Sequence, residues 1–169
     1  MTRKWCVFLG GFGIAVLAAL TGCSPLGVGV TGITVAEDGT PVGVMLVCHD
    51  HIDGASLYDV DADEADEIGS WSRRKPATGF SVWSLRTGGR GWRAGTPLAA
   101  LDPHHTYTLR GWTDNHSAMT FEVTFTAAQL ARLEPGQVRY LKGEGPGTDR
   151  DGYATVSMDA FRADACRDV

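Results

Sequence analysis

Short apolar runs alternate along the chain with polar segments rich in glycine, proline and aspartate, and this pattern predicts a β-rich fold. No alternation of strands with long helices indicates βαβ units, so we expect an all-β domain, an antiparallel β-sandwich of immunoglobulin-like or related Greek-key topology with one short helix. A small barrel is the alternative arrangement. The predicted strands cover residues 33–36, 42–49, 68–72, 80–86, 107–112, 120–125, 138–142 and 153–161.

Two of these segments also predict which side chains are buried. Residues 42–49 are apolar on both faces, as is typical of a strand covered on both sides. Residues 120–125 alternate, which predicts Phe121, Val123 and Phe125 on the buried face. The helix is expected directly afterwards, over residues 126–133, with Thr126 as its N-cap.

The first residues carry a different pattern, that of an export signal. Arg3 and Lys4 precede a run of fourteen uncharged residues, 7–20, which fits the apolar region of a signal peptide and is short for a membrane-spanning helix. Residues 20–23, Leu-Thr-Gly-Cys, follow this run. They resemble the lipobox of bacterial lipoproteins, in which a diacylglyceryl group is attached to the cysteine and the chain is cut just before it.

This resemblance implies that Cys23 is lipidated, carries fatty acyl chains such as palmitate and becomes the first residue of a protein on the outer face of the cell membrane. The alternatives are a plain signal peptide and an uncleaved anchor. The implied division is a signal peptide at 1–22, a lipid tether at 23–31 and a β-sandwich domain at 32–169. Residues 107–112, 125–130 and Cys166 also resemble lipoproteins of actinobacteria that carry no known activity.

Charge argues against nucleic acid as a partner. The chain has 15 basic and 20 acidic residues, a net charge of −5. Loss of Arg3 and Lys4 with the signal peptide lowers the basic count from 15 to 13, so the net charge of the mature chain becomes −7. An acidic domain of this kind repels the phosphate backbone. A membrane surface reached through the lipid, an envelope protein or a glycan are the expected partners.

The cysteines predict one disulfide. Cys6 would leave with the signal peptide and Cys23 would carry the lipid, so Cys48 and Cys166 remain. Two remaining thiols in an oxidising compartment are expected to pair, although two free thiols are the alternative. The bond would join the end of the strand at 42–49 to the last residues of the chain.

Histidines next to Cys48 form a candidate metal site. In a regular strand His49 and His51 share one face and Cys48 points to the other. Two histidines at this spacing can bind Cu²⁺ or Zn²⁺ when a third ligand arrives, for which His104, His105 and His116 are candidates. The spacing matches no standard metal motif, so solvated residues at a strand end are the alternative.

Six carboxylates lie within residues 59–67. Asp59, Asp61 and Asp63 fit the first ligand positions of a calcium-binding EF-hand loop, but Glu64 stands where glycine is needed. We therefore expect a solvated acidic loop rather than a calcium site.

Trp92 is the candidate for ligand binding, because it lies in the glycine-rich run 88–95 between Arg90 and Arg93. An exposed indole there could stack on a sugar or a peptide. The alternative is a ring that folds back to close one end of the core. Trp83 and Trp112 lie inside predicted strands and are expected in the core.

Motifs of common enzymes and cofactor sites do not occur in the sequence. It contains no Gly-x-Ser-x-Gly, no His-Glu-x-x-His and no phosphate-binding glycine loop with its lysine. We expect no enzymatic activity and no cofactor. The sequence predicts a lipid-anchored extracytoplasmic module with a binding or envelope-associated role, and a metal-handling lipoprotein that uses His49 and His51 is the alternative.

Overall fold

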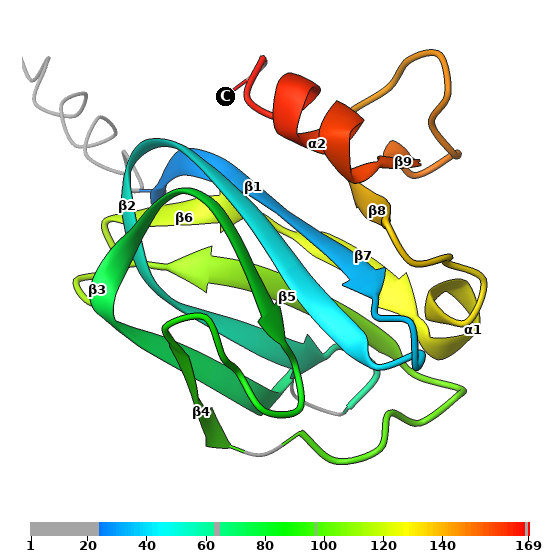
Figure 1. Cartoon of the computed structure of the whole chain (residues 1–169), viewed down its shortest axis with the longest axis horizontal. Coiled ribbons are helices and arrows are strands. Elements are labelled where there is room, and N and C mark those ends of the chain that lie inside the picture. The colour runs from blue at the N-terminus through cyan, green and yellow to red at the C-terminus, as the bar shows by residue number, and fades with distance from the viewer. Residues whose placement is uncertain (1–23, 63–64, 97, 168) are drawn as a thin grey trace, which may run out of the picture.

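The computed structural model describes residues 24–62, 65–96, 98–167 and 169. Most of these residues form strands of one connected sheet, accompanied by two short helices (Figure 1). The order along the sheet is β4-β3-β2-β5-β6-β1-β8-β9, and β7 pairs with β5. The elements are β1 (Leu26–Val35), β2 (Pro41–Asp59), β3 (Asp66–Ser84), β4 (Trp92–Thr96), β5 (Thr106–Trp112), β6 (Ala118–Phe121), β7 (Val123–Thr126), α1 (Ala127–Leu130), β8 (Gln137–Leu141), β9 (Tyr153–Ser157) and α2 (Met158–Asp164).

Four strands close on themselves as in a small barrel. The first half of β2 pairs with β1 and its second half pairs with β5. β6 then joins the two partners, antiparallel to β5 and parallel to β1. The β-rich class is therefore confirmed. The two-sheet sandwich with Greek-key topology is not confirmed, because the pairing joins all the described strands into one sheet that curves round.

The bend in β2 makes this closure possible. Its pairing with β3 shifts register between Val47 and Ile52, and Asp50 has a φ of 55° in the left-handed region. An irregularity of this kind bends a strand and re-aims its side chains. Both halves of β2 still pair with β3, and the two strands form the long curved hairpin at the front of Figure 1.

Apolar side chains pack on both faces of the sheet. The larger cluster fills the inside and includes Met45, Trp71, Trp83 and Phe125. Val44, the neighbour of Met45, belongs to a second cluster. That cluster packs under α2 and comprises Val30, Val44, Val138, Tyr140, Ala154, Phe161 and Ala165. Neighbouring residues of β2 thus face different cores, as the doubly apolar pattern of residues 42–49 predicts.

The predicted lipid tether at 23–31 is wrong from Leu26 onward. β1 begins there, and Val28 and Val30 are fully or almost fully buried. Glycines in this segment serve close packing: a methyl group on Gly29 would collide with the backbone of Leu46 in β2. Small residues therefore mark a tightly packed central strand here.

Two further boundaries differ from the prediction. The last predicted strand, 153–161, ends at Ser157, whose side chain caps the N-terminus of a second helix, α2. The predicted strand at 120–125 is interrupted at Glu122, so Phe121 is 43 % exposed instead of buried. Thr120 takes the buried position and bonds through its hydroxyl group to Thr31.

The first helix follows the prediction at its start. The hydroxyl of Thr126 accepts a hydrogen bond from the backbone of Gln129, whose side chain accepts one from the backbone of Thr126. This reciprocal capping box satisfies two backbone donors at the helix N-terminus.

Candidate functional site

The predicted disulfide between Cys48 and Cys166 is confirmed. The two residues are 118 positions apart, and their Cα atoms lie 5.5 Å from each other. Cys48 lies at the bend of β2 and Cys166 lies just after α2. The bond therefore fixes the C-terminal segment against the barrel.

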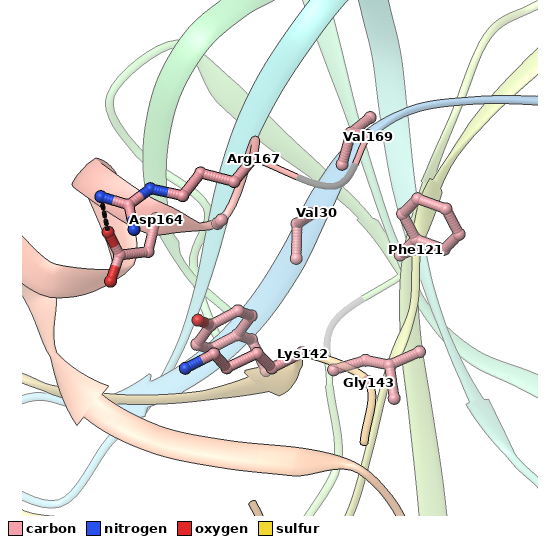
Figure 2. Close-up of a pocket in the computed structure, with 10 residues that line it drawn as sticks. Val30, Phe121, Lys142, Gly143, Asp164, Arg167 and Val169 are labelled. Atoms are coloured by element: carbon pink, nitrogen blue, oxygen red, sulfur yellow. Dashed lines mark ion pairs between the residues drawn. The ribbon is translucent and has the colours of Figure 1, made fainter. Parts of the chain in front are cut away.

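A hollow of about 390 Å³ lies beside this fixed segment, and we name it the C-terminal pocket. Figure 2 shows Val30 and Phe121, which come from two strands, between Val169 above and Lys142 and Gly143 below. It is lined by Val30, Phe121, Tyr140, Leu141, Lys142, Gly143, Asp164, Ala165, Arg167 and Val169.

Charged groups of the C-terminal pocket lie at its rim. The side chain of Arg167 is 71 % exposed, and it forms an ion pair of 3.0 Å with Asp164, which is the dashed contact in Figure 2. A backbone oxygen of Val169 is 3.3 Å from the His49 ring nitrogen. The walls between these groups are apolar, so this pocket suits an apolar ligand segment better than a compact ion.

A second hollow, of about 480 Å³, lies on the outer face of β2, β3 and β5. We name it the aromatic hollow. Its residues come from outward-facing positions of paired strands, with Ser56 opposite Arg110 and Tyr58 opposite Glu67. The lining comprises Pro25, Ser56, Tyr58, Glu67, Arg110, Trp112, Asp114, His116, Ala118 and Met119.

Trp112 lies over the backbone of β2 in this hollow. Its cross-strand partner is Gly54, and a methyl group on Gly54 would overlap the six-membered ring of the indole. The indole N–H donates a hydrogen bond of 2.8 Å to the hydroxyl of Ser56. The missing side chain and this hydrogen bond together hold the ring against the sheet.

Polar groups surround the aromatic side chains. The guanidinium of Arg110 lies 4.7 Å from the ring centre of Tyr58, and the Tyr58 hydroxyl donates to Glu67 at 3.4 Å. Asp114 and His116 lie on the loop after β5 and also line the hollow. A flat aromatic ring beside carboxylate, guanidinium and imidazole groups can stack on an apolar ligand face while bonding to its hydroxyl groups.

A third hollow, of about 400 Å³, lies between the other two, and we name it the connecting groove. It shares Pro25 and Met119 with the aromatic hollow. It shares Phe121 and Leu141 with the C-terminal pocket. The full lining is Pro25, Gly27, Met119, Thr120, Phe121, Glu122 and Leu141.

The candidate metal ligands His49 and His51 have different partners. His49 contacts a backbone oxygen of Val169, whereas His51 lies 2.6 Å from Asp50 and 3.5 Å from Asp53. The hydrogen bond with Asp50 raises the pKa of His51. The regular strand that would place both rings on one face is broken here, since Asp50 lies at the bend. Within the described ranges, no three His, Cys, Asp or Glu side chains are grouped to hold a metal ion.

The acidic run of residues 59–67 contributes a carboxylate to a histidine pair. Asp59 at the end of β2 lies 2.6 Å from the ring of His105, and the carboxylate of Asp61 accepts a hydrogen bond from the backbone of Thr106. The hydrogen bond to Asp59 raises the pKa of His105. Burial opposes ionisation of Asp59, but the His105 ring and backbone donors outweigh it and lower the pKa of Asp59.

The prediction that Trp92 binds a ligand at the surface is wrong. It is 4 % exposed and stacks on Trp83, with ring centres 4.3 Å apart. The guanidinium of Arg73 lies 5.2 Å from the Trp92 ring centre. The ring therefore closes the core, which is the alternative that the sequence left open.

Trp112 was expected in the core, but it lines the aromatic hollow on the outer face of the sheet. The alternation along β5 could have predicted this position, because Tyr107 and Leu109 are buried whereas Arg110 and Trp112 are half-buried on the other face. A tryptophan in phase with an arginine indicates the outer face of a half-buried strand.

Comparison with family models, curated proteins and solved structures finds no match to this chain. Neither of the helices in the described ranges is long and apolar enough to cross a bilayer. Cys23 and the signal-peptide residues lie outside the described residues.

Proposed function

We propose that the chain is a lipid-anchored extracytoplasmic module that binds a neutral glycan in the aromatic hollow, without catalysing a reaction on it. The observation that carries this proposal is the position of Trp112, held over Gly54 and next to Ser56. The lipobox-like residues 20–23 support the location.

A sugar ring has an apolar face of C–H groups and an edge of hydroxyl groups. Trp112 and Tyr58 offer aromatic surface for the apolar face. Glu67 and Asp114 can accept hydrogen bonds from hydroxyl groups, and Arg110 can donate them. This combination of groups fits a glycan better than a purely apolar molecule.

The charge of the hollow favours a glycan without acidic groups. Two carboxylates, Glu67 and Asp114, face one guanidinium, Arg110, which also lies 4.0 Å from Glu122. The mature chain as a whole is acidic, with a net charge of −7 once Arg3 and Lys4 are removed from the 15 basic residues against 20 acidic ones. Sulfated or carboxylated sugars would be repelled.

Binding of neutral oligosaccharides to the full lipidated chain in detergent tests the proposal. A panel of immobilised neutral and acidic glycans is probed first, and the affinity of the best neutral one is then measured by calorimetry. Trp112→Ala should weaken binding by about tenfold or more, since an aromatic contact contributes on the order of 1 kcal/mol beyond its buried area. Trp112→Phe should retain part of the affinity because it keeps an aromatic face.

Arg132→Ala serves as the control, because this residue is exposed and lies away from all three hollows. Its affinity should equal that of the unmodified chain. Equal affinity of Trp112→Ala and the unmodified chain, or binding restricted to acidic glycans, would contradict the proposal.

A further inference from the structure

We infer that the ligand is a glycolipid, whose sugar occupies the aromatic hollow and whose acyl chain lies along the connecting groove into the C-terminal pocket. This inference rests on the proposed glycan binding. The acyl site itself is an additional feature, assembled from β1, β6, β8 and the segment after α2.

The three hollows adjoin one another, because neighbouring hollows share lining residues. Pro25 and Met119 border both the aromatic hollow and the connecting groove. Phe121 and Leu141 border both the connecting groove and the C-terminal pocket. The aromatic hollow is lined by aromatic and hydrogen-bonding side chains, whereas the C-terminal pocket has Val30, Phe121, Leu141 and Ala165 in its wall, with Lys142, Asp164 and Arg167 at its rim. An amphiphile with a sugar head and a hydrocarbon tail has the same order of groups.

Part of the apolar surface of the connecting groove is exposed to water. Three large hydrophobic residues are exposed in the described part of the chain, namely Leu26, Val60 and Phe121. Of these three, Phe121 borders the groove, whereas Leu26 and Val60 line none of the three hollows. Gly27 lets the Phe121 ring lie close to β1, because a methyl group there would approach the ring to 3.2 Å. Covering this surface with a hydrocarbon chain removes apolar area from water, which is favourable.

The charges near the groove are arranged for an uncharged tail. Arg167 pairs with Asp164 at the rim of the C-terminal pocket, as Figure 2 shows, and Glu122 lies 4.0 Å from Arg110. Lys142 lines the pocket with a long aliphatic stem, which can cover a hydrocarbon chain while its ammonium group stays in water. Val30 and Ala165 supply apolar wall between these groups.

The position of Pro25 indicates which face of the domain would lie next to a lipid on Cys23. Pro25, two positions after Cys23, borders both the aromatic hollow and the connecting groove. A lipid on Cys23 would bring this entrance to the membrane surface, where glycolipids are held. The anchor's own acyl chains are the competing occupant. Stable anchoring needs two chains in the bilayer, so withdrawing one into the groove would weaken the anchor, whereas a second lipid carries no such cost.

The test uses the full lipidated chain and three probes: a diglycosyl diacylglycerol, its free disaccharide and the diacylglycerol without sugar. Each is titrated in detergent micelles of the same composition. The glycolipid should bind at least about tenfold more tightly than the free disaccharide, because the tail buries apolar surface. The diacylglycerol without sugar should bind more weakly than the glycolipid.

Phe121→Asp places a charge in the groove and should remove the advantage of the glycolipid while leaving the affinity for the disaccharide unchanged. Val60→Asp is the matched control, because Val60 is similarly exposed at 42 % but lies outside the three hollows. It should change neither affinity. Phe121 is exposed, so the substitution leaves the core intact.

The remaining outcomes separate the two proposals. Equal affinity for the glycolipid and the disaccharide overturns the acyl site and leaves the glycan function standing. If none of the probes binds, the inference is overturned and the glycan function also loses support. If the diacylglycerol binds as tightly as the glycolipid, the inference is overturned. A gain in glycolipid affinity in Cys23→Ala would show that the anchor's own chain fills the groove, and it would overturn the inference as well.

Discussion

Gly54 of β2 and Trp112 of β5 are cross-strand partners, and the indole ring fills the space that a side chain on Gly54 would need. The ring can lie against the sheet only because β2 carries glycine at this position. The two residues therefore have to be considered as one structural unit, in which Gly54 sets the position of the ring and the Ser56 hydroxyl sets its orientation.

Gly54→Ala is expected to destabilise the chain by roughly 1–3 kcal/mol, the usual cost of overpacking, because the methyl group must displace the ring of Trp112. Chemical denaturation measures the loss. Gly145→Ala is the control, since its added methyl group meets no atom within 4 Å. In a Trp112→Ala background the cost of Gly54→Ala should largely disappear. An equal cost in both backgrounds would show that the ring is not the cause.

Cys166→Ser should lower the free energy of unfolding by several kcal/mol. The bond closes a loop of 118 positions, for which the chain-entropy model gives roughly 4–5 kcal/mol. Urea denaturation under non-reducing conditions measures the change. Cys48→Ser and the double variant should be as unstable as Cys166→Ser, because each removes the same bond. A single variant as stable as the unmodified chain would contradict this expectation.

Stability from the His105–Asp59 pair should depend on pH. The folded-state pKa of His105 is raised, so its contribution is fully present below the ordinary histidine pKa of about 6.5 and is lost as pH rises through the raised value. The pKa of Asp59 is lowered, so its contribution is present above its ordinary pKa and is lost as pH falls through the lowered one.

Thermal melts of the unmodified chain and His105→Ala test this pair. The difference in melting temperature should be larger at about pH 5.5 than at about pH 8.5, where the imidazole is neutral. His104→Ala is the control, because His104 is the neighbouring histidine and is exposed. A difference that grows from pH 5.5 to 8.5 would refute the assignment.

Replacing both His49 and His51 with alanine should leave the response to Zn²⁺ unchanged. The two rings have separate partners, Val169 for one and Asp50 with Asp53 for the other. A ligand that binds the folded state must raise its melting temperature. Melts with and without Zn²⁺ or Cu²⁺ should therefore coincide for both chains. A rise confined to the unmodified chain would favour the metal-handling alternative.

Cys23→Ala should abolish lipidation and release the protein from the membrane fraction or leave it uncleaved. Metabolic labelling with a fatty-acid analogue measures this directly. Cys6→Ala is the control, since Cys6 precedes the expected cleavage site and should not affect the label. Equal label on the Cys23→Ala variant and the unmodified chain would overturn the lipoprotein assignment.

The sequence predicted the β-rich class, the disulfide and the capped start of α1, because each depends on local chemistry or on a count of thiols. Closure of the strands into a small barrel was only the alternative prediction, because closure depends on the bend in β2. Asp50 adopts a positive φ there, and its sequence surroundings are those of an ordinary polar strand end.

The candidate site was harder to predict, because its residues depend on which face of a strand is covered. Phe121 and Thr120 exchange their expected burial, since the interruption at Glu122 changes the phase of the alternation. Trp92 and Trp112 likewise exchange roles. An indole is large enough to suit either a core or a binding surface, so only the pairing of Trp92 with β3 and its stacking on Trp83 decide between them.

The early start of β1 limits how far the module can reach. Only Ser24 and Pro25 separate Cys23 from Leu26, so the Cα atoms of Cys23 and Leu26 are at most roughly 11 Å apart. With a lipid on Cys23, the linker between the membrane and the domain would be only two residues long. The domain would then find partners by lateral diffusion in the plane of the membrane. A molecule deep in the cell wall would have to reach the bilayer before the protein could bind it.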